Sequence, residues 1–181
     1  NKNVIIIAGP TASGKSNLAI DIAEEFSGIV INADSMQIYK GLEIITSSPN
    51  SAIKKRVIHK LYNVREPKKP CSAGVWQKLA TKEICRAHDK DVLPIVVGGT
   101  GLYLRTLIEG IANLPKIPIE IQNTVRNKML KEGGKKLHQE LSKLDPKTAS
   151  TLNVADIQRI CRALEVFLTT GQSLTNLQRD N

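Results

Sequence analysis

An apolar, β-branched run at residues 4–8 leads directly into the pattern G-x-x-x-x-G-K-S at residues 9–16, and no other feature constrains the fold as strongly. The run predicts a buried strand, and apolar residues at helical spacing between residues 17 and 26 predict a helix after it. The glycines permit a tight loop whose amide N–H groups point at one cluster of oxyanions, and a helix N-terminus adds attraction. The sequence therefore predicts a site for a phosphate or diphosphate.

Each residue of this loop is assigned to the predicted diphosphate or nucleotide site. Lys15 adds a point charge that attracts the bound oxyanions. The hydroxyl of Ser16 is the predicted metal ligand, with Mg²⁺ as the expected cofactor. The full set is Gly9, Pro10, Thr11, Ala12, Ser13, Gly14, Lys15 and Ser16.

The metal-holding acid of ATPases and GTPases is missing from the second predicted strand. Residues 92–97 form this strand, and glycines and Thr100 follow it instead of an acid. The strand at residues 29–32 is followed by Asp34. Because ligands of parallel sheets sit at the carboxyl ends of strands, we expect Asp34, Thr100 and the phosphate loop to surround one crevice. This arrangement favours transfer of a phosphate-bearing group over a nucleotide switch.

Strands and helices alternate up to residue 113, which predicts the α/β class with a P-loop NTPase-like parallel sheet flanked by helices. A proline-containing break at residues 114–118 then precedes lysine-rich helical patterns joined by Gly133-Gly134. We expect residues 1–113 to form the P-loop core and residues 114–154 a small helical insertion. A final helix within residues 155–181 is expected to return to the core. Its predicted apolar stripe is Ile157, Ile160, Leu164, Phe167 and Leu168.

The chain is basic, with a formal net charge of +9 and a pI near 9.6. This charge favours a polyanionic partner such as nucleic acid, although a solvated basic surface explains it equally well. No apolar stretch approaches 18 residues and no signal peptide opens the sequence, so we expect a cytoplasmic protein with no membrane partner. His59, His88 and His138 lie among charged residues and are expected at the surface.

Four motifs occur together and in order along the chain. They are GPTASGKS at residues 9–16, DSMQIYKG at residues 34–41, GGTGLY at residues 98–103, and DIQRICRALE at residues 156–165 followed by TGQ at residues 170–172. The set resembles the bacterial tRNA dimethylallyltransferases, also called tRNA isopentenyltransferases or the IPP transferase family. The likeness runs from Val4 to Gln172, nearly the whole chain.

The resemblance implies an activity and a role for several residues. The activity is transfer of a dimethylallyl group from dimethylallyl diphosphate to the exocyclic amine of the adenosine 3′ to the anticodon in tRNA. The phosphate loop would hold the donor diphosphate, and Lys15 would be a catalytic residue that stabilises the leaving group. Asp34 would act as general base, and Thr100, also counted as catalytic, would contact the reacting nucleotide. The tRNA contacts implied by the resemblance are Asp34, Ser35, Met36, Gln37, Thr100, Gln122, Gln158, Arg159, Ile160, Cys161 and Arg162.

The chain departs from the family pattern at several positions. Ser48 stands where a lysine is usual, Gln122 where an arginine contacts tRNA, and Cys71 where a tyrosine is common. The sequence ends at Asn181, whereas family members continue for about another domain. We therefore expect a chain truncated at its C-terminus relative to the family.

Two other functions remain open from the sequence. One is an adenylate isopentenyltransferase that uses a free nucleotide as acceptor, and the other is a non-catalytic P-loop module that binds nucleotide or nucleic acid. Ala12-Ser13 and the polar face of residues 158–162 favour tRNA as the acceptor. Asp34 argues against a pure binding module. We expect the protein to be a monomer whose partners are the tRNA anticodon stem-loop and dimethylallyl diphosphate.

Overall fold

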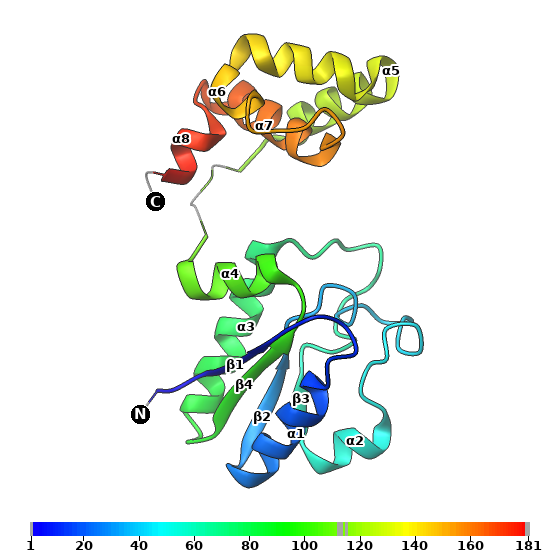
Figure 1. The fold of residues 1–181 in the computed structure, drawn as a ribbon, viewed down its shortest axis with the longest axis vertical. Helices are drawn as coiled ribbons and strands as arrows, with labels where there is room; N and C mark the ends of the chain where they lie inside the picture. The colour runs from blue at the N-terminus through cyan, green and yellow to red at the C-terminus, as the bar shows by residue number, and fades with distance from the viewer. Residues whose placement is uncertain (1, 112–113, 115, 180–181) are drawn as a thin grey trace. The chain divides into compact units, whose positions relative to one another are not determined.

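The computed structural model describes residues 2–111, 114 and 116–179 (Figure 1). They divide into two compact units between residues 111 and 112. The expected boundary at residue 113 lies outside the described residues. No helix among those described is long and apolar enough to cross a membrane.

The first unit contains a parallel sheet with strand order β1-β4-β2-β3, which confirms the predicted α/β class (Figure 1). Helix α2 and strand β3 were not predicted. Strand β3 has only three residues, two of them polar, which is too short for a hydrophobic pattern to emerge. The elements in chain order are β1 (Ile5–Ala8), α1 (Lys15–Glu25), β2 (Gly28–Asn32), α2 (Ser51–Arg56), β3 (Ile58–Lys60), α3 (Ala73–His88), β4 (Leu93–Gly98) and α4 (Gly101–Glu109).

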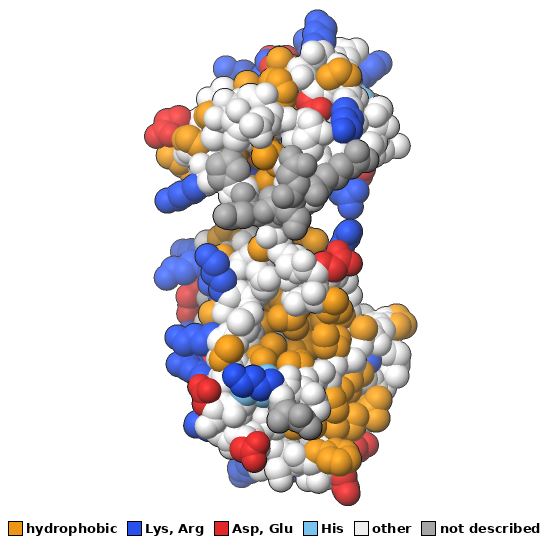
Figure 2. All heavy atoms as spheres, turned by 90° about the vertical axis from the view of Figure 1, so that its left-hand side faces the viewer, with side chains coloured by type: hydrophobic (Ala, Val, Ile, Leu, Met, Phe, Trp, Pro, Cys, Tyr) orange, Lys and Arg blue, Asp and Glu red, His pale blue; other side chains and the backbone are white. Residues whose placement is uncertain are grey.

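Helices cover both faces of this sheet, so the strands read as continuous apolar runs. Alternate residues of β2 point to opposite faces: Ile29 and Ile31 pack with α3 and α4, whereas Val30 packs with α1 (Figure 1). Strand β1 lies at the edge of the sheet, and its three isoleucines are only half-buried. A broad hydrophobic patch is visible on the face of the first unit drawn in Figure 2.

Trp76 anchors α3 and α4 to the carboxyl end of β2. Its ring is fully buried and stacks on Tyr103 of α4, with the ring centroids 4.6 Å apart. Its indole Nε1–H donates a hydrogen bond to the carbonyl of Asn32 at 2.8 Å. Ser72 caps α3 as expected, because its hydroxyl accepts a hydrogen bond from the amide of Val75. Trp76 therefore fixes the position of α3 and α4 relative to the end of β2, just before Asp34.

The ends of β2 and β4 approach each other so closely that only glycine fits at residue 98. A Cβ there would lie closer than 3.0 Å to the backbone of Ala33. Two hydrogen bonds hold this approach: the amide of Ala33 donates to the carbonyl of Val97 at 2.8 Å, and the amide of Thr100 donates to the carbonyl of Ala33 at 3.2 Å. The residues after both strands are therefore placed side by side.

The second unit is helical, with α5 (Ile119–Leu144), α6 (Pro146–Ala149), α7 (Ile157–Thr170) and α8 (Leu174–Arg179). The expected glycine junction is present, because Gly133 leaves helical geometry with φ 80° and ψ 165°. Helix α7 packs against α5 within this unit, and its expected return to the P-loop core stays a prediction. The residues that form this core are Val125, Leu137, Leu141, Ala149, Ile160, Ala163 and Leu164.

The apolar face of α7 is also rotated from the predicted stripe. Ile160 and Leu164 are buried as predicted, but Ile157 and Leu168 are 38% and 47% exposed. Ala163 and Val166 are buried in their place. Small residues at these positions let α7 lie close to its neighbours, and a pattern search that favours large side chains overlooks them.

The three histidines, predicted at the surface, are half-buried there. His138 shows why: its Nε2 lies 3.1 Å from the carbonyl oxygens of both Ala149 and Leu152, so it ties α5 to the segment around α6. These partners lie 11 and 14 residues away in the chain, so the sequence around the histidine does not reveal this role.

Substituting Gly98 by alanine should destabilise the first unit by about 1–3 kcal/mol or more, because the new methyl group overlaps the Ala33 backbone. Gly101→Ala is the matched control, since its Cβ would meet nothing within 4 Å. Urea unfolding of both variants measures the difference. Equal midpoints for the two variants would show that the close approach of β2 and β4 is not a tight constraint.

Candidate functional site

The phosphate loop connects β1 to α1 and has left-handed backbone at two positions, Ala12 (φ 62°) and Gly14 (φ 82°). Gly14 occupies the N-cap of α1 and makes no side-chain capping bond. The amide of Leu18 donates to the Gly14 carbonyl, so the amides of Lys15 and Ser16 precede the hydrogen-bonded ladder of the helix. These amides and the helix dipole form a site suited to an anion.

Lys15 is the first residue of α1, and its ammonium group turns back over the loop. Its Nζ donates hydrogen bonds to the carbonyl of Pro10 and, at 3.2 Å, to the hydroxyl of Ser13. The Ser13 hydroxyl donates to the same Pro10 carbonyl at 2.8 Å. The positive charge therefore lies within the curve of the loop, beside the N-terminal amides of α1.

The carboxyl ends of three strands meet beside this loop, as the sequence predicted. A Cβ on Gly99, after β4, would lie 3.2 Å from the carbonyl oxygen of Gly9, after β1. On the other side, the amide of Ser35 donates to Thr100 Oγ1 at 2.9 Å. The structure thus brings the phosphate loop, Thr100 and the segment that contains Asp34 to one edge of the sheet.

Asp34 is held in one orientation by its own turn. Its Oδ1 accepts hydrogen bonds from the amides of Met36 at 2.8 Å and Gln37 at 3.3 Å. After burial, the charge of Asp34 contributes to a raised pKa of two nearby tyrosines, Tyr62 and Tyr103. Burial, and after it the charge of Asp34, raises the pKa of Tyr62, and burial is also the largest cause of the raised pKa of Tyr103. Both phenols therefore stay neutral beside a fixed carboxylate.

Asn32 was not predicted, yet it organises this turn. Its side chain is fully buried, and its Oδ1 accepts a hydrogen bond from the amide of Asp34 at 2.8 Å. Its Nδ2 donates to the carbonyls of Asp34 at 3.0 Å and Leu61 at 3.1 Å. A polar residue at the end of an apolar strand is the only signal in the sequence, and its partner Leu61 is distant along the chain.

The predicted tRNA-contacting residues of the second unit have different exposures. Gln158 and Arg159 are exposed on α7, and Arg162 is half-buried with its Nη1 3.4 Å from Glu165 Oε2. The side chain of Ile160 does not fit the predicted tRNA contact, because it is fully buried and packs in the helical core. Cys161 also packs against this core, and burial raises its pKa.

Gln122 and most lysines of the second unit lie on α5. The side-chain Nε2 of Gln122 donates a hydrogen bond to the carbonyl of Ile117 at 3.0 Å, which ties the first turn of α5 to the residues before it. Lys128 forms an ion pair with Glu140 at 2.7 Å. On the face drawn in Figure 2, the Lys and Arg side chains of the second unit are dispersed rather than gathered into one patch.

Comparisons with known proteins show which family the chain resembles. A family model described as IPP transferase matches residues 37–181. The chain is 48% identical over 171 residues to a tRNA dimethylallyltransferase of Zymomonas mobilis, covering 94% of this chain and 54% of that protein. It is 45% identical over 171 residues to a tRNA dimethylallyltransferase of Pelagibacter ubique, covering 94% and 55%. The chain thus spans about half the length of the curated relatives it matches.

Two solved structures are also similar. One is a full-length tRNA isopentenylpyrophosphate transferase from Bacillus halodurans, with a TM-score of 0.61 and 34% identity over 95% of this chain and 57% of that one. The other is a eukaryotic dimethylallyltransferase acting on tRNA, with a TM-score of 0.80 and 30% identity over 100% of this chain and 45% of that one.

Lys15→Ala should weaken binding of inorganic diphosphate roughly ten- to hundredfold, the effect expected when a charge-assisted hydrogen bond is lost. Isothermal titration calorimetry measures the affinity directly. Lys90→Ala is the control, because Lys90 is an exposed lysine of the same unit at the end of α3. An unchanged diphosphate affinity in Lys15→Ala would remove this lysine from the site.

Proposed function

We propose that this chain, which belongs to the IPP transferase family, transfers a dimethylallyl group from dimethylallyl diphosphate to tRNA. The acceptor is the exocyclic amine of the adenosine 3′ to the anticodon. One observation supports the proposal above the others: the phosphate loop, Asp34 and Thr100 meet at the carboxyl ends of neighbouring strands. In the proposed reaction, the diphosphate would leave from one side of the allylic carbon, and the amine, with Asp34 beside it, would attack from the other.

The chemistry requires little more than these groups. An aromatic amine is a weak nucleophile, but the allylic carbon–oxygen bond of the donor loosens readily as the diphosphate leaves. The N-terminal amides of α1 and the ammonium of Lys15 stabilise the negative charge that builds on the leaving group. The amine nitrogen bonds to the allylic carbon, the diphosphate departs with the bonding electrons, and Asp34 accepts the amine proton.

Magnesium is proposed as the cofactor, and the protein would hold it through a single side chain. The hydroxyl of Ser16 lies at the exposed start of α1, beside the proposed diphosphate site. Mg²⁺ is commonly bound by one or two protein ligands together with phosphate oxygens and water, which fits this donor set. When bound, the ion would neutralise charge on the diphosphate.

The second unit is proposed to bind the anticodon stem-loop. Gln158 and Arg159 are exposed on one face of α7, and Arg162 lies on the same helix. Guanidinium groups suit phosphate recognition, and the target adenosine has to leave its stack to reach the half-buried Asp34. We further propose that the protein acts as a monomer in the cytoplasm, where its tRNA substrate is found.

Asp34→Asn should lower the rate of prenyl transfer by about two to four orders of magnitude, because asparagine cannot accept the amine proton. The side-chain oxygen of the new asparagine can still accept hydrogen bonds from the backbone amides of Met36 and Gln37, so the turn should be preserved. Single-turnover transfer of labelled dimethylallyl groups to an anticodon stem-loop measures the rate. Asp89→Asn, an exposed aspartate after α3, is the control.

The same assay distinguishes the two acceptors. Label should enter the stem-loop and not free AMP, since an adenylate isopentenyltransferase would give the opposite result. A near-normal rate in Asp34→Asn would exclude Asp34 as the base. Failure of the parent protein to label either acceptor under conditions where it binds the donor would contradict the proposed activity.

Arg162→Ala should weaken binding of the stem-loop and reduce the slope of log affinity against log salt by about one, the contribution of one phosphate contact. Donor binding should not change. Arg86→Ala is the matched control, because Arg86 also pairs with a glutamate three residues away but lies in the first unit. Identical affinities of parent and Arg162→Ala across a salt series would make this face of α7 an ordinary solvated surface.

A further inference from the structure

Asn32 is the last residue of β2, and its polar side chain interrupts an apolar strand. The side chain is fully buried. Because side chains alternate along a strand, it lies on the same face as Val30, which packs with α1 in an apolar cluster. An aliphatic residue would suit this face, since a buried amide has to find hydrogen-bond partners to offset its lost hydration. Packing of the sheet therefore does not explain the asparagine.

The Asn32 side chain binds backbone groups that lie beyond the ends of the strands. Its Oδ1 accepts a hydrogen bond from the amide of Asp34 at 2.8 Å. Its Nδ2 donates to the carbonyl of Asp34 at 3.0 Å and to the carbonyl of Leu61 at 3.1 Å. Strand β2 does not need these bonds for its own pairing, because its backbone pairs with β4 in register with Val97. The buried amide is thus used to hold the residue that is proposed as the base.

The segment that begins at Leu61 lies beside the Asp34 turn. The amide of Asn63 donates a hydrogen bond to the carbonyl of Gln37 at 2.9 Å. Leu61 has left-handed backbone with φ 62°, a conformation that a bulky residue keeps only where surrounding contacts hold it. The bond from Asn32 to the Leu61 carbonyl is one of these contacts, so Asn32 joins the two segments.

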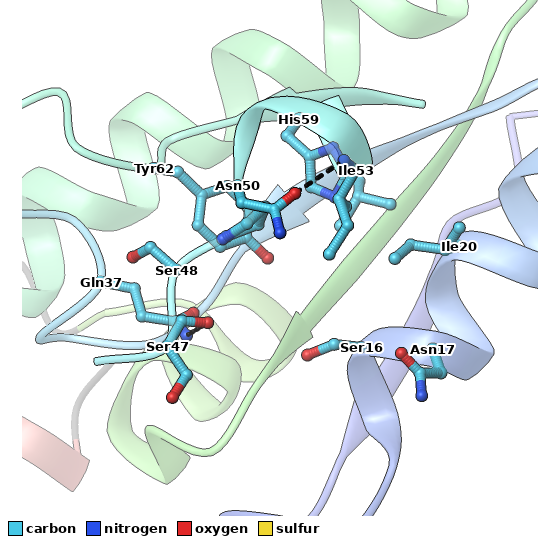
Figure 3. A pocket seen from close by; sticks show the side chains of 12 residues that line it. Ser16, Asn17, Ile20, Gln37, Ser47, Ser48, Asn50, Ile53, His59 and Tyr62 are labelled. Carbon is cyan, nitrogen blue, oxygen red and sulfur yellow. Dashed lines mark hydrogen bonds between the residues drawn. The ribbon is translucent and has the colours of Figure 1, made fainter. Parts of the chain in front are cut away.

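The joined segments contribute to the wall of a cavity that opens beside the phosphate loop. Figure 3 shows Tyr62 across this cavity of about 240 Å³ from Ser16, the last residue of the loop. The ring of His59, which also lines the cavity, meets the Tyr62 ring edge-on with the centroids 5.5 Å apart. Burial, and after it the charge of Asp34, raises the pKa of Tyr62, which agrees with a carboxylate close to this wall. The bonds of Asn32 therefore bear on how the carboxylate lies relative to the loop.

We propose that Asn32 is a positioning residue for prenyl transfer, whose side-chain amide fixes the Asp34 backbone and so places the carboxylate relative to the phosphate loop. The inference rests on the proposed function, in which Asp34 accepts the proton of the amine. Asn32 is fully buried and would touch neither substrate. The amides of Met36 and Gln37, which orient the carboxylate, belong to the same turn and move with the backbone that Asn32 holds. Loss of the Asn32 bonds should therefore affect the chemical step.

Asn32→Leu tests the proposal, because leucine has a similar shape and forms none of these hydrogen bonds. The single-turnover rate of transfer to the anticodon stem-loop should fall roughly ten- to hundredfold, the effect of misplacing a reacting group by about 1 Å. Affinity for inorganic diphosphate, measured by calorimetry, should stay at the value of the parent.

Ser72→Ala is the matched control for lost stability. It removes the cap of α3 and destabilises the same unit without touching the Asp34 turn. At a temperature where circular dichroism shows both variants to be folded, the rate of Ser72→Ala should equal that of the parent.

Asn32→Asp separates positioning from stability, because it keeps the shape of the side chain and the acceptor for the Asp34 amide. Burial and the nearby charge of Asp34 raise the pKa of the new carboxyl. Below that pKa its hydroxyl donates to one of the two carbonyls, and above it the ionised group repels both. Burial raises the pKa of Tyr62 and of Tyr103, the tyrosines that interact with Asp34, so both stay neutral. The rate relative to the parent at each pH should therefore rise as the pH falls.

Several outcomes would overturn the inference. A parent-like rate in Asn32→Leu would show that the base is placed without this residue, and would leave the proposed function intact. A rate that falls together with the diphosphate affinity would mean that Asn32 supports the whole site instead of the base. If Asn32→Leu does not fold, a pH-independent rate ratio in Asn32→Asp contradicts the proposal. A parent that binds diphosphate and labels neither acceptor ends the proposed function, and the role of Asn32 with it.

Discussion

The contact between the ends of β2 and β4 is the constraint on which the candidate site depends. Because residue 98 has no side chain, the backbone of β4 can press against Ala33, and two hydrogen bonds hold the strands at that distance. Thr100 then reaches Ser35, and the Asp34 turn is fixed beside the phosphate loop. A separation larger by one methyl group would move the carboxylate relative to the loop, and misplacement of about 1 Å is enough to slow a positioned reaction markedly.

Buried polar groups supply the precision that sheet packing alone lacks. Asn32 uses its whole amide to bind Asp34 and the segment after β3, while Trp76 binds the Asn32 carbonyl from α3. Each of these bonds lies in a region where an unpaired partner would be costly, so alternative arrangements of the turn are disfavoured. These bonds hold the backbone of Asp34, and the amides of Met36 and Gln37 orient its carboxylate.

Charge is distributed unevenly between the parts of the molecule that the proposed reaction would use. The donor diphosphate would meet Lys15 and the helix amides, and tRNA would meet the basic residues of the second unit. Each environment matches one chemical part of the substrates.

Much of the candidate site could be predicted from the sequence, because its signals are local. A strand, a glycine loop, a lysine and a helix start are contiguous, and Asp34 and Thr100 each follow an apolar strand directly. The tertiary structure alone decided the roles of Asn32, His59 and Tyr62, the packing of α7 against α5, and the burial of Ile160. These features depend on partners distant in the chain, and residue type and spacing carry no information about which distant backbone or helix face a side chain will meet.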